Sequence, residues 1–191
     1  MRYILAVCCV LLSAASLADE AAWGFLKGGG YVVIMRHGLT DPPRGEDPPN
    51  FTYDDCATQR NLSPTGIADS QRLADAFKRR GVAVGEVYSS RYCRCRDTAQ
   101  LAFGRYEVRE VLNGYRGPQP WWEAFSFDEL MQVRGWLSDP VSGGGNRILV
   151  THNTHIKALT DTWVDPGEML VVRPLGRMFF TVVGRIKVAD Y

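Results

Sequence analysis

Short apolar segments that are typical of buried strands alternate along this chain with amphipathic segments that are typical of helices. Residues 31–35, YVVIM, form the first such strand by their length and branched side chains. Further strand patterns occur at residues 84–90, 106–112 and 147–150, and helical patterns lie between them. Alternation of this kind is typical of a parallel sheet with helices on both faces. We therefore predict a three-layer α/β/α fold with a mostly parallel central sheet.

The clearest helix is predicted at residues 61–81, because both of its ends carry suitable capping residues. Ser63 can cap the first turn, Pro64 suits the first helical position, and Gly81 ends the helix after three basic residues. The remaining predicted elements are helices at residues 19–28, 91–101, 121–137 and 156–163 and a C-terminal hairpin of strands at residues 167–174 and 177–188.

The first 18 residues have the three-part pattern of a secretory signal peptide. Arg2 precedes ten apolar residues, small residues follow them, and we expect cleavage after Ala18. This apolar run is shorter than the roughly 20 residues that cross a bilayer, so we expect no stable membrane insertion. Residues 19–191 are expected to form a single domain, because the chain has no repeat and no linker. The predicted location is therefore periplasmic or secreted.

The charge balance argues against a large anionic partner. Loss of residues 1–18 removes only Arg2, which leaves 21 basic and 21 acidic residues and a net charge of zero. Nucleic-acid-binding domains carry a basic excess, so we expect no nucleic acid as a partner. The same composition leaves the oligomeric state open.

Three cysteines remain after the predicted cleavage, and an exported protein with three cysteines is expected to form one disulfide. A bond between Cys93 and Cys95 would strain the geometry, because only one residue separates them. We therefore expect Cys56 to pair with Cys93 or with Cys95.

Basic and polar side chains follow three of the predicted strands at the points where the strands end. Arg36, His37 and Gly38 follow the first strand, Ser89 and Ser90 end the second with several arginines after them, and Thr-His-Asn follows the fourth at residues 151–153. In open α/β sheets, ligands bind at the carboxyl ends of the strands. Guanidinium groups match phosphate oxygens, and a neutral imidazole is a competent nucleophile. Gly38 removes a side chain where the backbone can approach a ligand, and its N–H is a further candidate phosphate contact. The cluster therefore predicts phosphoryl transfer.

Four motifs in this order resemble the histidine phosphatase superfamily, the family of phosphoglycerate mutases and histidine acid phosphatases. They are MRHGLT after the first strand, NLSPTG at a helix start, SSRYCRCRDTAQLA after the second strand and VTHNTHI after the fourth. The resemblance spans most of residues 31–160 and implies a phosphoglycerate mutase-like fold. It also implies a phosphatase that needs no cofactor and acts on a small phosphorylated substrate.

The resemblance assigns roles to individual residues. His37 is expected to accept the phosphoryl group, Arg36 and Arg94 to bind its oxygens, and His152 to stabilise the transferring group. Arg91 and Arg96 flank the family position of Arg94 and are expected to be surface charges.

The acid that protonates the leaving group is less well defined by the motifs. Mutase-like members carry a glutamate where this chain has Asn113 and Gly114, and acid phosphatases carry an aspartate where it has Asn153. Glu168 is our preferred candidate for this acid. The alternatives are Glu123, Asp41 and Glu46.

Other functions remain open at this stage. A site without an effective acid would make the chain a weak or inactive phosphate-binding module, and a phosphomutase is a further alternative. A zinc site of His152, His155 and a cysteine would require reduced thiols and would give His37 no role, so we predict no metal. Aromatic residues 121, 122 and 125 are candidates for a pocket wall. Small exported relatives include a phosphatase acting on a lipopolysaccharide sugar, which makes an envelope sugar phosphate the expected substrate.

Overall fold

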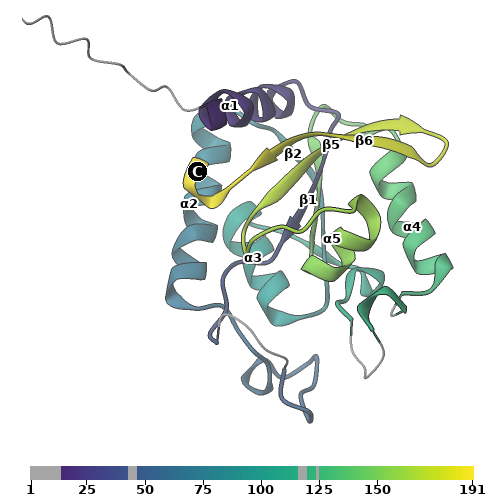
Figure 1. The fold of residues 1–191 in the computed structure, drawn as a ribbon. Helices are drawn as coiled ribbons and strands as arrows, with labels where there is room; N and C mark the ends of the chain where they lie inside the picture. Colours follow the sequence, from purple (N-terminus) through teal and green to yellow (C-terminus); the bar gives the residue numbers. More distant parts are fainter. Residues whose placement is uncertain (1–13, 43–46, 116–119, 124) are drawn as a thin grey trace, which may run out of the picture.

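The computed structural model describes residues 14–42, 47–115, 120–123 and 125–191, and within these ranges the chain forms one six-stranded sheet with helices on both faces (Figure 1). The strand order is β3-β2-β4-β1-β5-β6. The strands are β1 (Val32–Arg36), β2 (Val84–Ser89), β3 (Glu107–Val108), β4 (Asn146–Thr151), β5 (Met169–Gly176) and β6 (Phe179–Ile186).

The first four strands of this order run parallel, β5 runs antiparallel to them, and β6 pairs antiparallel with β5 and so runs in the same direction as the first four. Because β1, β2 and β4 are parallel neighbours, their carboxyl ends meet at one edge of the sheet. In β1, Arg36 pairs in register with Thr151 of β4, and in β2, Ser89 pairs with Val150. The register therefore brings the residues that follow these three strands together.

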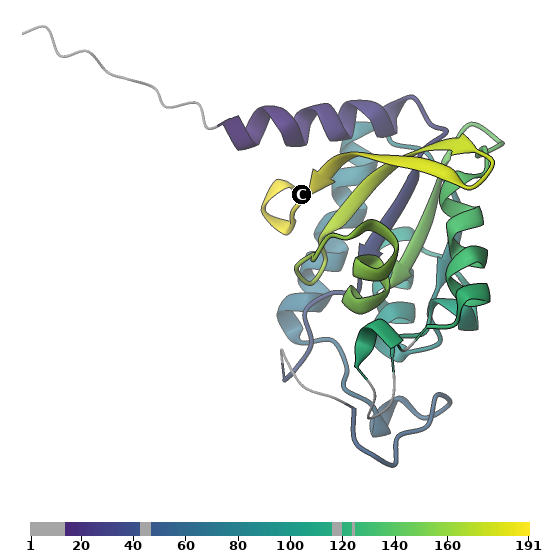
Figure 2. The ribbon, with the colours of Figure 1, turned by 45° about the vertical axis from the view of Figure 1, so that its right-hand side comes forward.

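Two layers of helices cover the sheet, so the predicted three-layer α/β/α architecture is confirmed (Figures 1 and 2). Alternate residues of β1 face opposite ways. Val33 and Met35 join the core under the first layer, and Val32 and Ile34 join the core under the second. The first layer holds α1 (Ala14–Lys27), α2 (Pro64–Arg80) and α3 (Cys93–Phe103), and the second holds α4 (Phe127–Ser138) and α5 (Asn153–Thr160).

Helix α2 confirms the capping residues read from the sequence. The Ser63 hydroxyl accepts the N–H of Gly66 at 3.0 Å, Pro64 opens the helix, and Gly81 ends it with a left-handed φ of 66°. The C-terminal hairpin is confirmed as well. Arg177 and Met178 form its tight turn with positive φ angles, a conformation that two-residue hairpin turns require.

The strand predicted at residues 106–112 is wrong in length. Only Glu107 and Val108 pair with β2, and a 3₁₀ turn at Glu110–Leu112 follows at once. The chain turns inward because Leu112 is fully buried in the core of the second layer, and its carbonyl accepts the Thr151 hydroxyl at 2.7 Å. Burial of one apolar side chain therefore ends this edge strand.

Several helix boundaries also differ from the prediction. Helix α4 begins at Phe127 rather than residue 121, because Ser126 and Glu129 form a capping box, and a separate 3₁₀ turn covers Trp121–Glu123. Helix α5 begins directly after His152 and ends at Thr160. Helix α1 begins at Ala14, upstream of the expected cleavage point, and the remainder of the predicted signal peptide lies outside the described residues. In the part of the chain that the structure covers, no helix has the length and apolar character to cross a membrane.

Candidate active site

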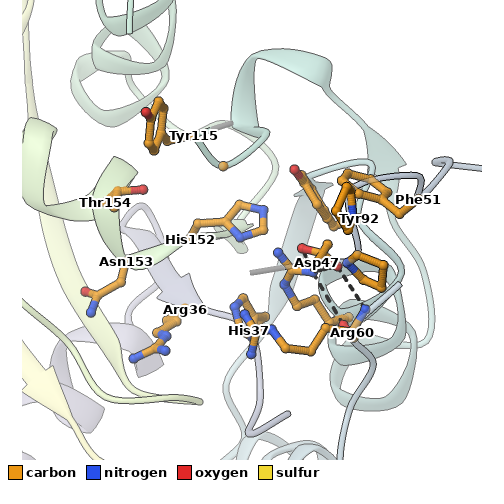
Figure 3. Close-up of a pocket in the computed structure, with 14 residues that line it drawn as sticks. Arg36, His37, Asp47, Phe51, Arg60, Tyr92, Tyr115, His152, Asn153 and Thr154 are labelled. Atoms are coloured by element: carbon orange, nitrogen blue, oxygen red, sulfur yellow. Dashed lines mark hydrogen bonds and ion pairs between the residues drawn. The ribbon is translucent and has the colours of Figure 1, made fainter. Parts of the chain in front are cut away.

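A cavity of about 320 Å³ lies at the edge of the sheet where β1 and β4 end (Figure 3). The four residues that the sequence assigned to phosphate binding and transfer all line it, together with two residues that the sequence analysis missed. The charged and imidazole side chains of the lining are Arg36, His37, Asp47, Arg60, Arg94 and His152.

His37 is buried and has one ring nitrogen fixed by the backbone. Its Nδ1 lies 2.8 Å from the carbonyl oxygen of Gly38, and a carbonyl can only accept, so Nδ1 carries the proton. The other nitrogen, Nε2, is therefore left with a lone pair. Burial, reinforced by the nearby charges of Arg94 and Arg36, holds the pKa of His37 well below its usual 6.5. This arrangement keeps His37 neutral and nucleophilic.

His152 faces His37 across the pocket, with the two ring centroids 5.4 Å apart. Its Nε2 lies 2.9 Å from the Ser90 hydroxyl, which in turn lies 3.0 Å from the amide oxygen of Asn113. Burial and the charge of Arg94 hold the pKa of His152 well below its usual value. On its other side, the ring lies against Gly114, where a Cβ would come within 2.7 Å of the His152 Cγ. Asn113 and Gly114, which occupy the position where a glutamate was expected, therefore both hold His152: Asn113 through the Ser90 hydroxyl, and Gly114 by leaving space for the ring.

Arg94 extends from the first turn of α3 and forms a buried ion pair with Asp47. Its Nη1 donates to both carboxylate oxygens, at 2.9 and 3.0 Å, and its guanidinium carbon lies 4.2 Å from the centre of the Tyr92 ring. The two side chains are only 5% and 8% exposed. The Arg94 Nε is buried and has no hydrogen-bond partner among the described residues.

Two more arginines add positive charge to the cavity. Arg60 donates to the Thr40 hydroxyl and to the carbonyl of Pro42, and its buried Nε also has no partner among the described residues. Burial and the charge of Arg94 lower the pKa of Arg60, which stays protonated at any working pH. Arg36 donates to the carbonyl of Val164 at 3.2 Å. Three guanidinium groups and one carboxylate give the described lining a positive charge that suits an anion.

Aromatic side chains form another part of the wall. Phe51 and Tyr92 pack together with ring centroids 5.3 Å apart, and Tyr115 lies on the opposite side of the pocket (Figure 3). Two of the aromatic residues named from the sequence, Trp122 and Phe125, do not line this cavity. Trp122 is exposed, and Phe125 stacks on His155.

The structure does not bring the preferred acid into the pocket. Glu168 is buried away from the lining, where its carboxylate pairs with Arg185 and accepts the N–H of Asp165. These partners explain why a carboxylate can be buried at that position. Glu123 and Asp41 are exposed and do not line the cavity, and Glu46 lies outside the described residues.

Gly38 has a different role from the one predicted. Its N–H donates to the Thr98 hydroxyl at 2.9 Å and is therefore engaged within the protein rather than with a ligand. A Cβ at Gly38 would lie 3.1 Å from the carbonyl oxygen of Gly66 and 3.2 Å from the Ser70 hydroxyl oxygen. The glycine thus allows the end of β1 to pack against the start of α2.

Asp47 and Arg60 were missed because the segment between β1 and α2 has no regular pattern. One feature of the sequence could have pointed to Arg60: it lies three residues before the helix cap Ser63, next to the predicted start of a helix. A Cβ at Gly66, in the first turn of α2, would collide with the Leu39 backbone, so this turn packs directly against the strand end that carries the nucleophile. Asp47 stands among prolines and had no comparable signal.

The cysteine expectation is resolved in favour of Cys93, which forms a disulfide with Cys56 across 37 residues of sequence. Cys95 is a buried free thiol, and burial raises its pKa to about 12. Among the residues covered by the structure, no group of three metal-binding side chains occurs. His155 packs on Phe125, and burial lowers its pKa to about 4.

Neither Arg91 nor Arg96 lines the cavity. Arg91 forms exposed ion pairs with Asp54 and Glu110. Arg96 lies beside the disulfide, with its Nη2 2.9 Å from the Cys93 sulfur. Of the three arginines, Arg94 is therefore the one that lines the cavity.

Comparison with known families gives one match. The model of the histidine phosphatase superfamily (branch 1) matches residues 32–113, a segment that contains His37, Asp47, Arg60 and Arg94. No curated protein sequence matches the chain.

Solved structures share the fold over most of the chain. The protein histidine phosphatase SixA complexed with tungstate has a TM-score of 0.62 at 15% identity, covering 84% of this chain and 98% of that one. Mycobacterial hydrolase 1 has a TM-score of 0.59 at 15% identity, covering 81% and 97%. A phosphoserine phosphatase from Entamoeba histolytica has a TM-score of 0.53 at 14% identity, covering 84% and 98%. At these identities the likeness establishes the fold.

Proposed function

We propose that this chain, whose residues 32–113 match the histidine phosphatase superfamily, hydrolyses a phosphomonoester through a phosphohistidine formed on His37. The proposal rests on the environment of the His37 Nε2 nitrogen. His37 has its Nδ1 proton committed to the Gly38 carbonyl, and its Nε2 lone pair stands in a cavity lined by Arg36, Arg60 and Arg94. A neutral nucleophile surrounded by guanidinium groups is suited to attack a phosphate.

The reaction takes two steps. The phosphate oxygens bind the arginine side chains, and Nε2 attacks phosphorus in line, so that the P–N bond forms as the ester P–O bond breaks. Water then attacks the phosphohistidine, and the P–N electron pair returns to Nε2 as inorganic phosphate forms. The negative charge of the transferring group spreads over oxygens that the arginine donors stabilise.

A trapping experiment tests this proposal. Rapid mixing with a ³²P-labelled phosphomonoester, followed by alkaline quenching, should label the wild-type protein, and the label should be stable to base and labile to acid. His37→Ala should give neither label nor turnover, because the Nε2 of the other lining imidazole, His152, is engaged with the Ser90 hydroxyl. His155→Ala serves as the matched control, since His155 is buried outside the lining and should still allow labelling. Turnover that survives in His37→Ala would overturn the proposal.

Export is the second part of the proposal. The signal-peptide pattern of residues 1–18 and the disulfide between Cys56 and Cys93 both suit an oxidising compartment. Cell fractionation with mass spectrometry of the N-terminus tests it. The expected result is a periplasmic or secreted protein beginning at Asp19, and a cytoplasmic protein that retains Met1 would contradict it.

An envelope sugar phosphate is the substrate class that we propose. The related structures carry names that refer to phosphorylated protein histidine and to phosphoserine, so this fold serves unlike leaving groups. In this chain, Phe51, Tyr92 and Tyr115 offer apolar ring faces beside the arginines, and such faces suit the C–H surface of a sugar. A panel of sugar phosphates, nucleotides and phosphoamino acids, compared by kcat/KM, tests this choice. A clear preference for a phosphoamino acid would contradict it.

A further inference from the structure

The leaving group of a phosphomonoester needs a proton, and the structure contains a carboxylate that the sequence analysis did not consider for this role. Asp47 is the only carboxylate among the described residues that line the cavity. It lies between Tyr92 and Arg60 in the close-up, on the segment that joins β1 to α2 (Figure 3). A general acid must come within hydrogen-bond reach of the leaving-group oxygen, so a carboxylate of the cavity lining is a candidate for this role.

Asp47 shares its partner with the incoming phosphate. Both of its carboxylate oxygens accept from the Nη1 of Arg94, and its Oδ1 also accepts the backbone N–H of Arg60 at 2.9 Å. A phosphate oxygen that binds the same guanidinium nitrogen would lie within about 5 Å of the carboxylate, since two acceptors of one nitrogen are each about 3 Å from it. Phosphate binding therefore brings two anionic groups together beside Arg94.

Phosphate binding also changes the partners of Asp47. In the empty pocket, Arg94 neutralises the Asp47 carboxylate. Once phosphate oxygens take over the Arg94 donors, the carboxylate loses that neutralisation and gains a neighbour of like charge. The side chain is 8% exposed, so bulk water screens this repulsion only weakly.

We propose that Asp47 is the catalytic acid and base of this enzyme, an assignment that rests on the proposed function of His37. In the first step, the Asp47 carboxyl gives its proton to the ester oxygen as the P–O bond breaks, and an alcohol leaves. In the second step, the Asp47 carboxylate accepts a proton from the attacking water as the P–N bond breaks. The carboxyl group is then restored, inorganic phosphate is formed, and the proton count closes.

The dependence of rate on the leaving group tests this assignment. Asp47→Asn should lower kcat for glycerol 2-phosphate, a poor alkoxide leaving group, by about 10²–10⁴-fold, the usual contribution of a general acid. The same variant should lose less than about tenfold toward 2,4-dinitrophenyl phosphate, whose leaving group needs no proton. The comparison of two substrates is internal to one variant, so a loss of folded protein cannot imitate it. Asp47→Glu should restore part of the activity toward glycerol 2-phosphate.

Two controls define the outcomes. Asp54→Asn removes the exposed partner of Arg91 and should leave both rates unchanged. Glu46→Gln removes the neighbouring carboxylate of the sequence and should also leave both rates unchanged. Equal losses toward the two substrates in Asp47→Asn would show that Asp47 only positions Arg94, and would overturn the proposal. A leaving-group effect in Glu46→Gln instead would overturn it too. Failure of the wild-type protein to form a phosphohistidine would count against the proposed function itself.

Discussion

Two arginine–aspartate pairs join the segment after β1 to the start of α3, and they differ mainly in burial. Arg94 pairs with Asp47 at side-chain exposures of 5% and 8%, whereas Arg91 pairs with Asp54 at 33% and 85%. Each guanidinium also lies over a tyrosine ring, at 4.2 Å for Arg94 and 4.9 Å for Arg91. The two pairs therefore make similar contacts and differ in their exposure to solvent.

This difference teaches that an ion pair's partners do not define its role. In water, the charges of an exposed pair are screened, and the pair contributes about 0–1 kcal/mol. In a buried pair, each charge depends on the other, and its field reaches neighbouring groups. The charge of Arg94 lowers the pKa of both His37 and His152. Variants of the two pairs can test how far this contrast extends.

Removal of the Arg94 side chain should have the largest effect. Arg94→Ala takes away donors that the transferring phosphate needs, and should lower kcat/KM for p-nitrophenyl phosphate by about 10²–10³-fold. It also leaves Asp47 without its guanidinium, which should lower the free energy of unfolding by about 3–5 kcal/mol. Steady-state kinetics and urea unfolding measure the two effects. Arg94→Lys keeps the charge but not the planar fork, so it should recover stability better than activity. A kcat/KM of Arg94→Ala within tenfold of wild type would contradict the claim that the buried pair differs in role from the exposed one.

Loss of the disulfide should affect both pairs, because Cys93 lies between Arg91 and Arg94 and its bond to Cys56 holds the two segments together. Cys56→Ala should lower the free energy of unfolding by about 2–4 kcal/mol. Urea denaturation checks this value. The double variant Cys56→Ala/Cys93→Ala should cost little more than either single variant, since all three lack the same bond. Additive losses would mean that the cysteines act through packing rather than through the bond.

The acid limb of the pH profile of kcat/KM should move when Arg94 is replaced and should stay in place when Arg91 is replaced. His37 has a pKa well below 6.5 and stays neutral as the pH falls through 6.5, so the acid limb of kcat/KM should lie below 6.5. Arg94→Gln removes a positive charge that lowers this pKa, so the limb should move toward 6.5. Arg91→Gln should leave the limb in place. A wild-type limb at or above 6.5 would contradict the assignment of His37 as a buried neutral nucleophile.

The free energy of unfolding should also decrease as the pH falls below 6.5. The unfolded chain takes up protons on its histidines below about pH 6.5, whereas His37, His152 and His155 resist protonation in the folded state. Stability is therefore lost as the pH falls below 6.5. For His155, whose folded pKa is about 4, the loss between pH 6.5 and pH 5 should be about 2 kcal/mol. Urea midpoints at the two pH values, with His155→Phe as the control, provide the measurement.

The smallest effect is expected at the exposed pair. Arg91→Ala should change the free energy of unfolding by less than about 0.5 kcal/mol, because solvent screens its partners. Its kcat/KM should stay within about twofold of wild type. A loss comparable to that of Arg94→Ala would mean that burial does not decide between the two pairs.

The sequence predicted the parts of the molecule that depend on local pattern. The strand YVVIM, the capped helix after Ser63 and the C-terminal hairpin each follow from side chains close together in the chain. The meeting of Arg36, His37 and His152 also followed, because parallel strands bring their carboxyl ends to one edge of the sheet.

The remaining parts depend on contacts between distant residues. Glu168 was the preferred acid, but its carboxylate is satisfied by Arg185, which is 17 residues away and on the neighbouring strand. Asp47 is 47 residues from Arg94 and stands in a segment without periodicity, so no pattern in the sequence relates the two. The length of β3 was overestimated because the alternating pattern of residues 106–112 does not reveal that Leu112 turns into the core.

Gly114 has a consequence for how this enzyme can change. The His152 ring fills the space that a side chain at residue 114 would occupy. A single substitution that installs a glutamate there, as mutase-like members have after the third strand, would therefore displace the histidine before it supplied an acid. Conversion toward that type of site needs coordinated changes around His152 as well. Because residue 114 is a glycine packed against His152, a single substitution there cannot convert this site into the mutase-like one.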